Sequence, residues 1–70
     1  MNRFYGKTYK YKDKVIVVCN IPVNDGFMIG HISRDEIVRE KMFPLFRSIN
    51  ATQGALDMFA VSKGLAEVQA

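Results

Sequence analysis

Cysteine and histidine are scarce in this 70-residue chain, which contains one of each, Cys19 and His31. A single cysteine excludes an intramolecular disulfide bond, and one cysteine with one histidine is too few for a structural zinc site built from those ligands. The chain also lacks the run of roughly 18 apolar residues that a membrane-spanning helix needs. Its N-terminus has a positive charge but no apolar core, so we expect no signal peptide, no membrane association and a cytoplasmic location.

The length of the chain limits the core that it can build. Seventy residues form at most one domain, placed here over 1–70. A domain of this size buries only about 60% of its unfolded surface, and small domains usually gain further stability from a disulfide, a metal or a second chain. Because the first two are excluded, we expect association with another chain. A hydrophobic share of 49% is ordinary for a folded domain.

The first half of the chain has strand patterns. Residues 4–12 alternate in the period of two that a strand requires, and a turn follows at 12–14. Residues 15–21 form a β-branched run that is apolar on both faces, which is typical of a central strand covered on both sides. Residues 24–26 predict a turn before a short third strand over 27–32.

Charge is distributed unevenly along the chain. Residues 1–14 hold five basic side chains and one acidic, whereas residues 15–70 hold five basic and six acidic. The excess positive charge therefore lies in the first predicted strand and its turn.

Ser33 marks an expected change from strand to helix. Ser33 and Glu36 have the spacing of a capping box, and Ile32 and Ile37 have that of a hydrophobic staple. These two signals predict a helix that begins at Arg34.

Pro44 interrupts this predicted helix, so we expect a kink or a break there. Asn50 or Thr52 would cap a second helix, and Gly64 is a typical C-terminal stop. The predicted fold is α+β, a three-stranded antiparallel β-meander followed by two α-helices (β-β-β-α-α). It comprises a basic meander over 1–32, a helical half over 33–64 and a short frayed tail over 65–70.

No pattern of residues predicts catalysis. Cys19 lies in an apolar strand with no base nearby, and His31 at the end of a strand is more typical of a structural group. Glu36 and Glu40 lie among basic residues and are typical of a solvated salt-bridge face. We therefore expect no catalytic residue, no metal, no cofactor and no small-molecule substrate. An enzyme around His31 and Cys19 ranks last among the hypotheses.

The N-terminal strand interleaves basic and aromatic side chains. Sheet-based binders of single-stranded nucleic acid use this combination to stack bases and neutralise phosphates. The residues of such a site would be Arg3, Tyr5, Lys7, Tyr9, Lys10, Tyr11, Lys12 and Lys14. Lysines on an edge strand also prevent edge-to-edge pairing of sheets, so nucleic-acid binding is kept as the alternative hypothesis.

The chain contains more apolar side chains than one small core accommodates. Two helices on one side of the sheet leave one apolar face of strand 15–21 uncovered, and Phe43 and Val61 fall outside the best core faces. Contiguous apolar surface usually marks an interface. The leading hypothesis is a non-enzymatic interaction module that binds a partner protein or forms a homodimer. A regulator or inhibitor of this kind suits phages and mobile elements. The expected interface residues are Phe43, Phe46, Met58, Phe59, Ile16 and Val18.

Overall fold

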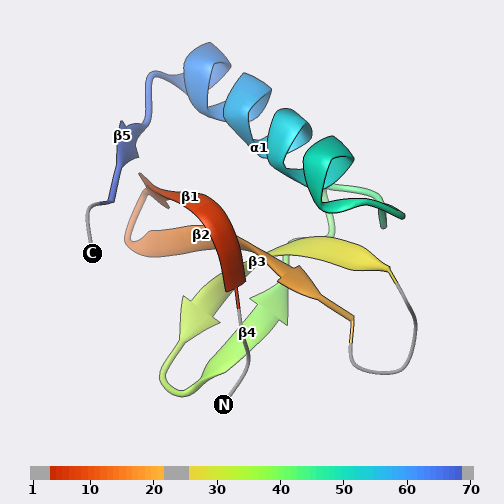
Figure 1. Ribbon diagram of the computed structural model, residues 1–70. Coiled ribbons are helices and arrows are strands. Elements are labelled where there is room, and N and C mark those ends of the chain that lie inside the picture. The colour runs from red at the N-terminus through yellow and green to blue at the C-terminus, as the bar shows by residue number, and fades with distance from the viewer. Residues whose placement is uncertain (1–3, 22–25, 69–70) are drawn as a thin grey trace.

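A computed structural model describes residues 4–21 and 26–68 of the chain. These residues form a five-stranded antiparallel sheet in the order β4-β3-β2-β1-β5, with one helix, α1, lying across one face (Figure 1). The elements are β1 (Phe4–Tyr11), β2 (Lys14–Asn20), β3 (Phe27–Ser33), β4 (Glu36–Arg39), α1 (Ile49–Lys63) and β5 (Ala66–Glu67). The α+β class is confirmed, but the expected three strands and two helices are not what the structure contains.

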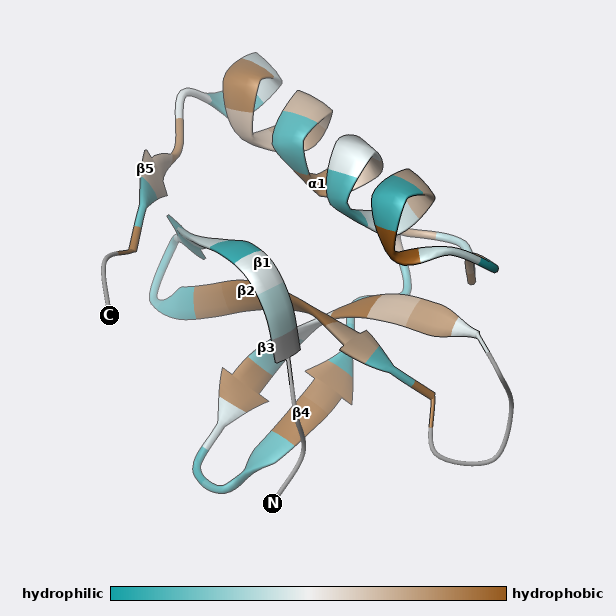
Figure 2. Cartoon of the chain, in the orientation of Figure 1, coloured by the Kyte–Doolittle hydropathy of each residue, from teal (hydrophilic) through white to brown (hydrophobic). Residues whose placement is uncertain are grey.

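The meander predicted for the first half forms as β1, β2 and β3, and β2 is the middle strand of the sheet. Ile16, Val17 and Val18 are fully buried and Cys19 is 1% exposed, so both faces of β2 are covered, as its apolar pattern predicted. Figure 2 shows the contrast between the hydrophobic β2 and the polar β1 beside it. The predicted turn at 24–26 lies largely outside the described residues.

The prediction of a helix that begins at Arg34 is wrong, because residues 36–39 form the strand β4. Arg34 and Asp35 are instead the two-residue loop of a hairpin in which Ser33 pairs with Glu36 and Ile32 with Ile37. Arg34 has a φ of 57°, and a positive φ at the first loop residue is what the favoured two-residue hairpin turns require. Lys12 has the same φ in the hairpin between β1 and β2, so both tight turns use a basic residue followed by aspartate.

The segment between β4 and α1 contains Pro44 and has no helical residues, so there is no kinked helix for Pro44 to divide. Phe46 in this segment exchanges two backbone hydrogen bonds with Phe27, at N···O distances of 2.8 and 2.9 Å, which ties the connection to β3. α1 then begins after Ser48, whose hydroxyl accepts a hydrogen bond from the Ala51 N–H at 3.0 Å. The N-cap is therefore Ser48, and not Asn50 or Thr52.

The C-terminal end of α1 is at the predicted residue. Gly64 has a φ of 65°, and the N–H groups of Gly64 and Leu65 donate to the carbonyls of Val61 and Ala60. The prediction of a frayed tail over 65–70 is wrong as far as residue 68. Ala66–Glu67 pairs with β1 as β5, and the Val68 N–H donates to the Thr8 carbonyl at 2.8 Å.

The core lies between α1 and one face of β1, β2 and β3. Its fully or nearly buried apolar members are Tyr9, Ile16, Val18, Ile29, Leu56 and Ala60. The residues from α1 are spaced four apart, which places them on one side of the helix. Leu56 is fully buried, so this side faces the sheet and the opposite side faces outward.

β1 departs from a regular strand opposite Val17. Tyr5 pairs with Val18 and Tyr9 with Ile16, so four positions along β1 match two along β2. This bulge includes Gly6, whose φ is 68°. The carboxamide of Gln53 from α1 occupies the space that a Cβ at residue 6 would take, so the glycine is needed both for its backbone conformation and for the close approach of the helix.

Candidate functional site

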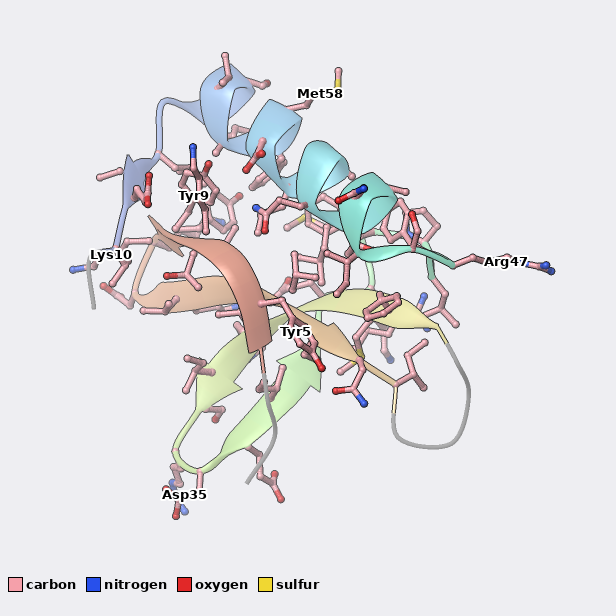
Figure 3. The ribbon with its side chains drawn as sticks, viewed as in Figure 1. Tyr5, Tyr9, Lys10, Asp35, Arg47 and Met58 are labelled. Atoms are coloured by element: carbon pink, nitrogen blue, oxygen red, sulfur yellow. The ribbon has the colours of Figure 1, made fainter. Side chains whose placement is uncertain are left out.

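The outward side of α1 carries mainly apolar and small side chains, with the polar Ser62 beside them. Ala51, Gly54, Met58 and Val61 are separated by three, four and three residues, which places them on one side of the helix, and all four are exposed. Met58 is 75% exposed and Val61 83%, the highest values among the large apolar side chains of the described residues. Figure 3 shows Met58 pointing away from the sheet. We call these four residues the outer face of α1.

The outer face has no charged side chain. Asp57 and Lys63 are the only charged residues of α1, and neither belongs to the face. Asp57 accepts hydrogen bonds from the Tyr9 hydroxyl and from the Gln53 side-chain amide, each at 2.8 Å, so its carboxylate is directed toward β1. Lys63 lies in the last turn, where a cation stabilises the negative end of the helix dipole. A solvated helix usually carries charged or polar groups on the side away from the core, so the outer face of α1 departs from that pattern.

The six predicted interface residues do not lie together. Met58 is on the outer face, whereas Ile16 and Val18 are fully buried between the sheet and α1, so these two are core residues and the prediction that they form an interface is wrong. Phe43, Phe46 and Phe59 are half-buried and pack against the core. Phe59 lies between two other rings, with its centroid 5.2 Å from Tyr11 and 5.1 Å from Phe43, both edge to face.

The aromatic side chains of the basic N-terminal strand are mostly engaged inside the molecule. Tyr9 is 9% exposed and donates to Asp57, Tyr11 packs against Phe59, and Tyr5 packs edge-on against Phe27 with 6.1 Å between ring centroids. The hydrogen bond to Asp57 and burial raise the pKa of Tyr9 to about 12.

The basic side chains of this strand differ in their surroundings, and the structure places only some of them apart from its rings. Lys7, Lys10 and Lys12 are exposed, and Lys10 points away from the molecule, as does Arg47 in the segment before α1 (Figure 3). Lys12 lies over the Tyr11 ring at 5.2 Å from its centroid. Lys14 forms an ion pair with Glu40 at 3.4 Å. Arg3 lies outside the described residues.

A small polar cluster joins the strands β2 and β3 to the segment after β4. Glu40 contacts both the Nδ1 atom of His31 and the Lys14 ammonium, and the side chains of His31 and Glu40 are 18% and 14% exposed. His31 therefore has a local partner, which is what a structural histidine needs. Cys19 is buried, and burial raises the pKa of its thiol, so the reactive thiolate is disfavoured.

Residues 4–21 and 26–68 offer few features of other kinds of site. No group of three histidine, cysteine, aspartate or glutamate side chains there could hold a metal ion. No helix in that part of the chain is long and apolar enough to cross a membrane. A surface hollow at the tip of the β3–β4 hairpin is lined by Ser33, Arg34, Asp35 and Glu36, all of them exposed.

The fold and the site together describe a small α+β protein with one exposed apolar helix face. No protein-family model matches the chain, and neither the curated proteins nor the solved structures include a match to it.

Three of the outer-face residues were not in the predicted interface. Val61 was recognised as lying off the core, but Ala51 and Gly54 gave no signal because the predicted second helix had no fixed starting residue. The identification of Ser48 as the N-cap fixes the helix. The buried Thr52, Leu56 and Ala60 then define its inner side, which assigns 51, 54, 58 and 61 to the opposite side.

Proposed function

We propose that this chain is a non-enzymatic protein-interaction module, and that it acts by docking the outer face of α1 on another protein surface. The observation that carries the proposal is the exposure of Met58 and Val61 on a helix side without charge. Contiguous exposed apolar surface usually marks an interaction site, and methionine is common at adaptable binding surfaces. A helix docked in this way is a frequent mode of protein recognition.

The alternative, binding of single-stranded nucleic acid, is less well supported. Base stacking needs accessible rings beside cations. Tyr9 and Tyr11 pack between β1 and α1, and the exposed Lys10 lies on the opposite side of β1 from them by strand alternation. Exposed lysines still permit weak contacts with phosphates, so this function needs its own test.

The test of the proposed function compares three forms of the tagged protein. The wild type and the variants Met58→Glu and Met42→Glu are used to capture proteins from the cells that produce the chain. Met42 is a matched control because it is 52% exposed but lies outside α1, so the same change in charge is made on a different surface. Proteins captured by the wild type and by Met42→Glu, but lost with Met58→Glu, would support the proposal. Identical capture by all three forms would contradict it.

The nucleic-acid alternative is tested by titrating a fluorescent single-stranded oligonucleotide at several salt concentrations. Binding that weakens steeply with salt and is lost in Lys10→Glu, but not in Met58→Glu, would favour the alternative. Absence of binding at low salt would remove it.

A further inference from the structure

The outer face of α1 has an order of sizes that is complementary to itself. Along the helix, two small residues, Ala51 and Gly54, are followed by two larger ones, Met58 and Val61. The sequence positions of Ala51 and Val61 are centred on residue 56, and so are those of Gly54 and Met58. A two-fold axis that crosses the outer face at the height of residue 56, perpendicular to the helix, would therefore place each small residue of one copy at the level of a large residue of the other.

We propose that α1 docks antiparallel on α1 of a second copy of this chain, with Met58 of each copy seated over Gly54 of the other and Val61 over Ala51. The proposal rests on the proposed function, since it names the partner of the same outer face. The two docked helices form an isologous contact, in which residue i meets residue j and j meets i, as closed two-fold dimers require.

The local geometry at Gly54 is suited to receive a side chain. A Cβ built at Gly54 would meet nothing within 4 Å, so the space above the residue is open. Met58 lies four residues further along the helix, about 6 Å along the axis, and is 75% exposed. Glycine in the middle of a helix costs about 1 kcal/mol relative to alanine, and it permits a close approach of another helix at the low end of the usual 8–10 Å range of interaxial distances.

A parallel orientation of the two helices is disfavoured by the sizes of the side chains that would then meet. In a parallel pair with a two-fold axis along the helices, Met58 would meet Met58 and Gly54 would meet Gly54. That arrangement places large groups against each other at one level and leaves a gap at the other, which loses packing contacts. The absence of charge on the outer face also means that two copies meet there without the repulsion that like charges would cause.

The size of the face predicts a weak dimer. α1 has 15 residues and so is about 22 Å long. One side of such a helix buries much less than the roughly 800 Å² per partner of a typical stable interface. We therefore expect reversible association that depends on protein concentration, with a dissociation constant in the micromolar range or weaker.

Sedimentation velocity over a wide range of protein concentration tests the association. The wild type and Met42→Glu should change from monomer to dimer as concentration rises, whereas Met58→Glu and Val61→Glu should remain monomeric. Neither substitution should unfold the chain, because both side chains are largely exposed. Circular dichroism of each variant checks that the fold is retained. A wild type that stays monomeric up to millimolar concentration, or a dimer that survives both variants, would overturn the proposal.

Disulfide trapping tests the antiparallel register. Gly54→Cys and Met58→Cys are prepared separately, and the native Cys19 does not interfere because it is buried. A mixture of the two variants should form disulfide-linked dimers faster than either variant alone. Faster linkage within each single variant would indicate a parallel or different register and would overturn the arrangement. A monomeric wild type that still captures a partner through Met58 would reject the second copy as occupant but leave the proposed function in place.

Discussion

The side-chain amide of Gln53 forms two hydrogen bonds with the backbone of Lys7. The Lys7 N–H donates to Gln53 Oε1 at 3.1 Å, and Gln53 Nε2 donates to the Lys7 carbonyl at 3.3 Å. Lys7 lies in the bulge of β1, where the backbone pairing with β2 is interrupted. The glutamine therefore satisfies polar groups that the sheet leaves without ladder partners, and it fixes α1 on the sheet with its outer face directed away.

Replacing Gln53 tests this link between α1 and β1. Gln53→Ala should lower the free energy of unfolding by about 1 kcal/mol, because the Lys7 backbone and Asp57 lose their bonds to the amide. Chemical denaturation measures the change. Asn50→Ala is a matched control, since it removes an exposed amide from the first turn of the same helix, and it should have little effect. Equal losses in both variants would mean that the amide of Gln53 has no special role.

The Tyr9–Asp57 hydrogen bond predicts a dependence of stability on alkaline pH. The pKa of Tyr9 is raised from 10.0 to about 12 in the folded chain, so between these values the unfolded state loses the phenol proton while the folded state retains it. The contribution to stability is thus complete below pH 10 and is lost as pH rises toward 12. Its magnitude is on the order of 2 kcal/mol. Chemical denaturation from neutral to alkaline pH should show this decline.

Tyr9→Phe separates this effect from the titration of other groups. The variant should be about 1 kcal/mol less stable than the wild type at neutral pH, because Asp57 loses one donor. The difference between the two proteins should fall to zero and then reverse as pH rises from 10 toward 12, because only the wild type loses the contribution of Tyr9. A constant difference at all pH values, or a tyrosinate absorbance curve with no tyrosine ionising well above pH 10, would contradict the assignment.

Two glycines should respond to alanine in opposite directions. A Cβ at Gly30 would lie 2.7 Å from both Ile37 Cγ2 and the Val38 carbonyl oxygen, so Gly30→Ala should force β3 and β4 apart and cost about 1–3 kcal/mol. Gly54 has open space, so Gly54→Ala should stabilise α1 by about 0.5–1 kcal/mol. Thermal unfolding of dilute protein measures both. A stabilising change at Gly30 would show that β4 does not approach β3 as closely as described.

Of the two residues in the β3–β4 turn, only Arg34 should give a more stable protein when it is replaced by glycine. Arg34 has a positive φ, which glycine adopts without a steric penalty, so Arg34→Gly should raise the free energy of unfolding by roughly 0.5 kcal/mol. Asp35 follows in the same loop without a positive φ, so Asp35→Gly should be neutral or destabilising. The reverse order of the two variants would contradict the hairpin.

The error over residues 33–39 has a definite physical cause. Residues i and i+3 are the partners of a capping box, but they are also the pair that flanks a two-residue hairpin loop, and Ser33 and Glu36 have that spacing. Ile32 and Ile37 likewise fit a staple and are in fact a cross-strand pair. The predicted proximity was right for both pairs, and the predicted element was wrong. The tight turn formed by Lys12 and Asp13 has the same order of a basic residue followed by aspartate. This likeness could have indicated that Arg34 and Asp35 also form a hairpin loop.

The candidate site was partly accessible from sequence. Met58 was identified because methionine is common at adaptable surfaces, and it is exposed. Ile16 and Val18 were assigned to an interface because two helices were expected on one side of the sheet; the structure instead buries both residues beneath α1 and also covers the opposite face of β2. The apolar pattern of residues 15–21 indicated burial on both sides, but which element covers each face depends on the curvature and pairing of the whole sheet, which no local pattern encodes.

Contact of the outer face of α1 with another protein surface can be detected by site-specific photo-crosslinking. A photoreactive amino acid is placed at position 58 in one form of the chain and at position 42 in another, and both are irradiated in the cells that produce the protein. We expect covalent adducts, with a second copy of the chain or another protein, from position 58 and none from position 42. Adducts formed equally at both positions, or only at position 42, would contradict it.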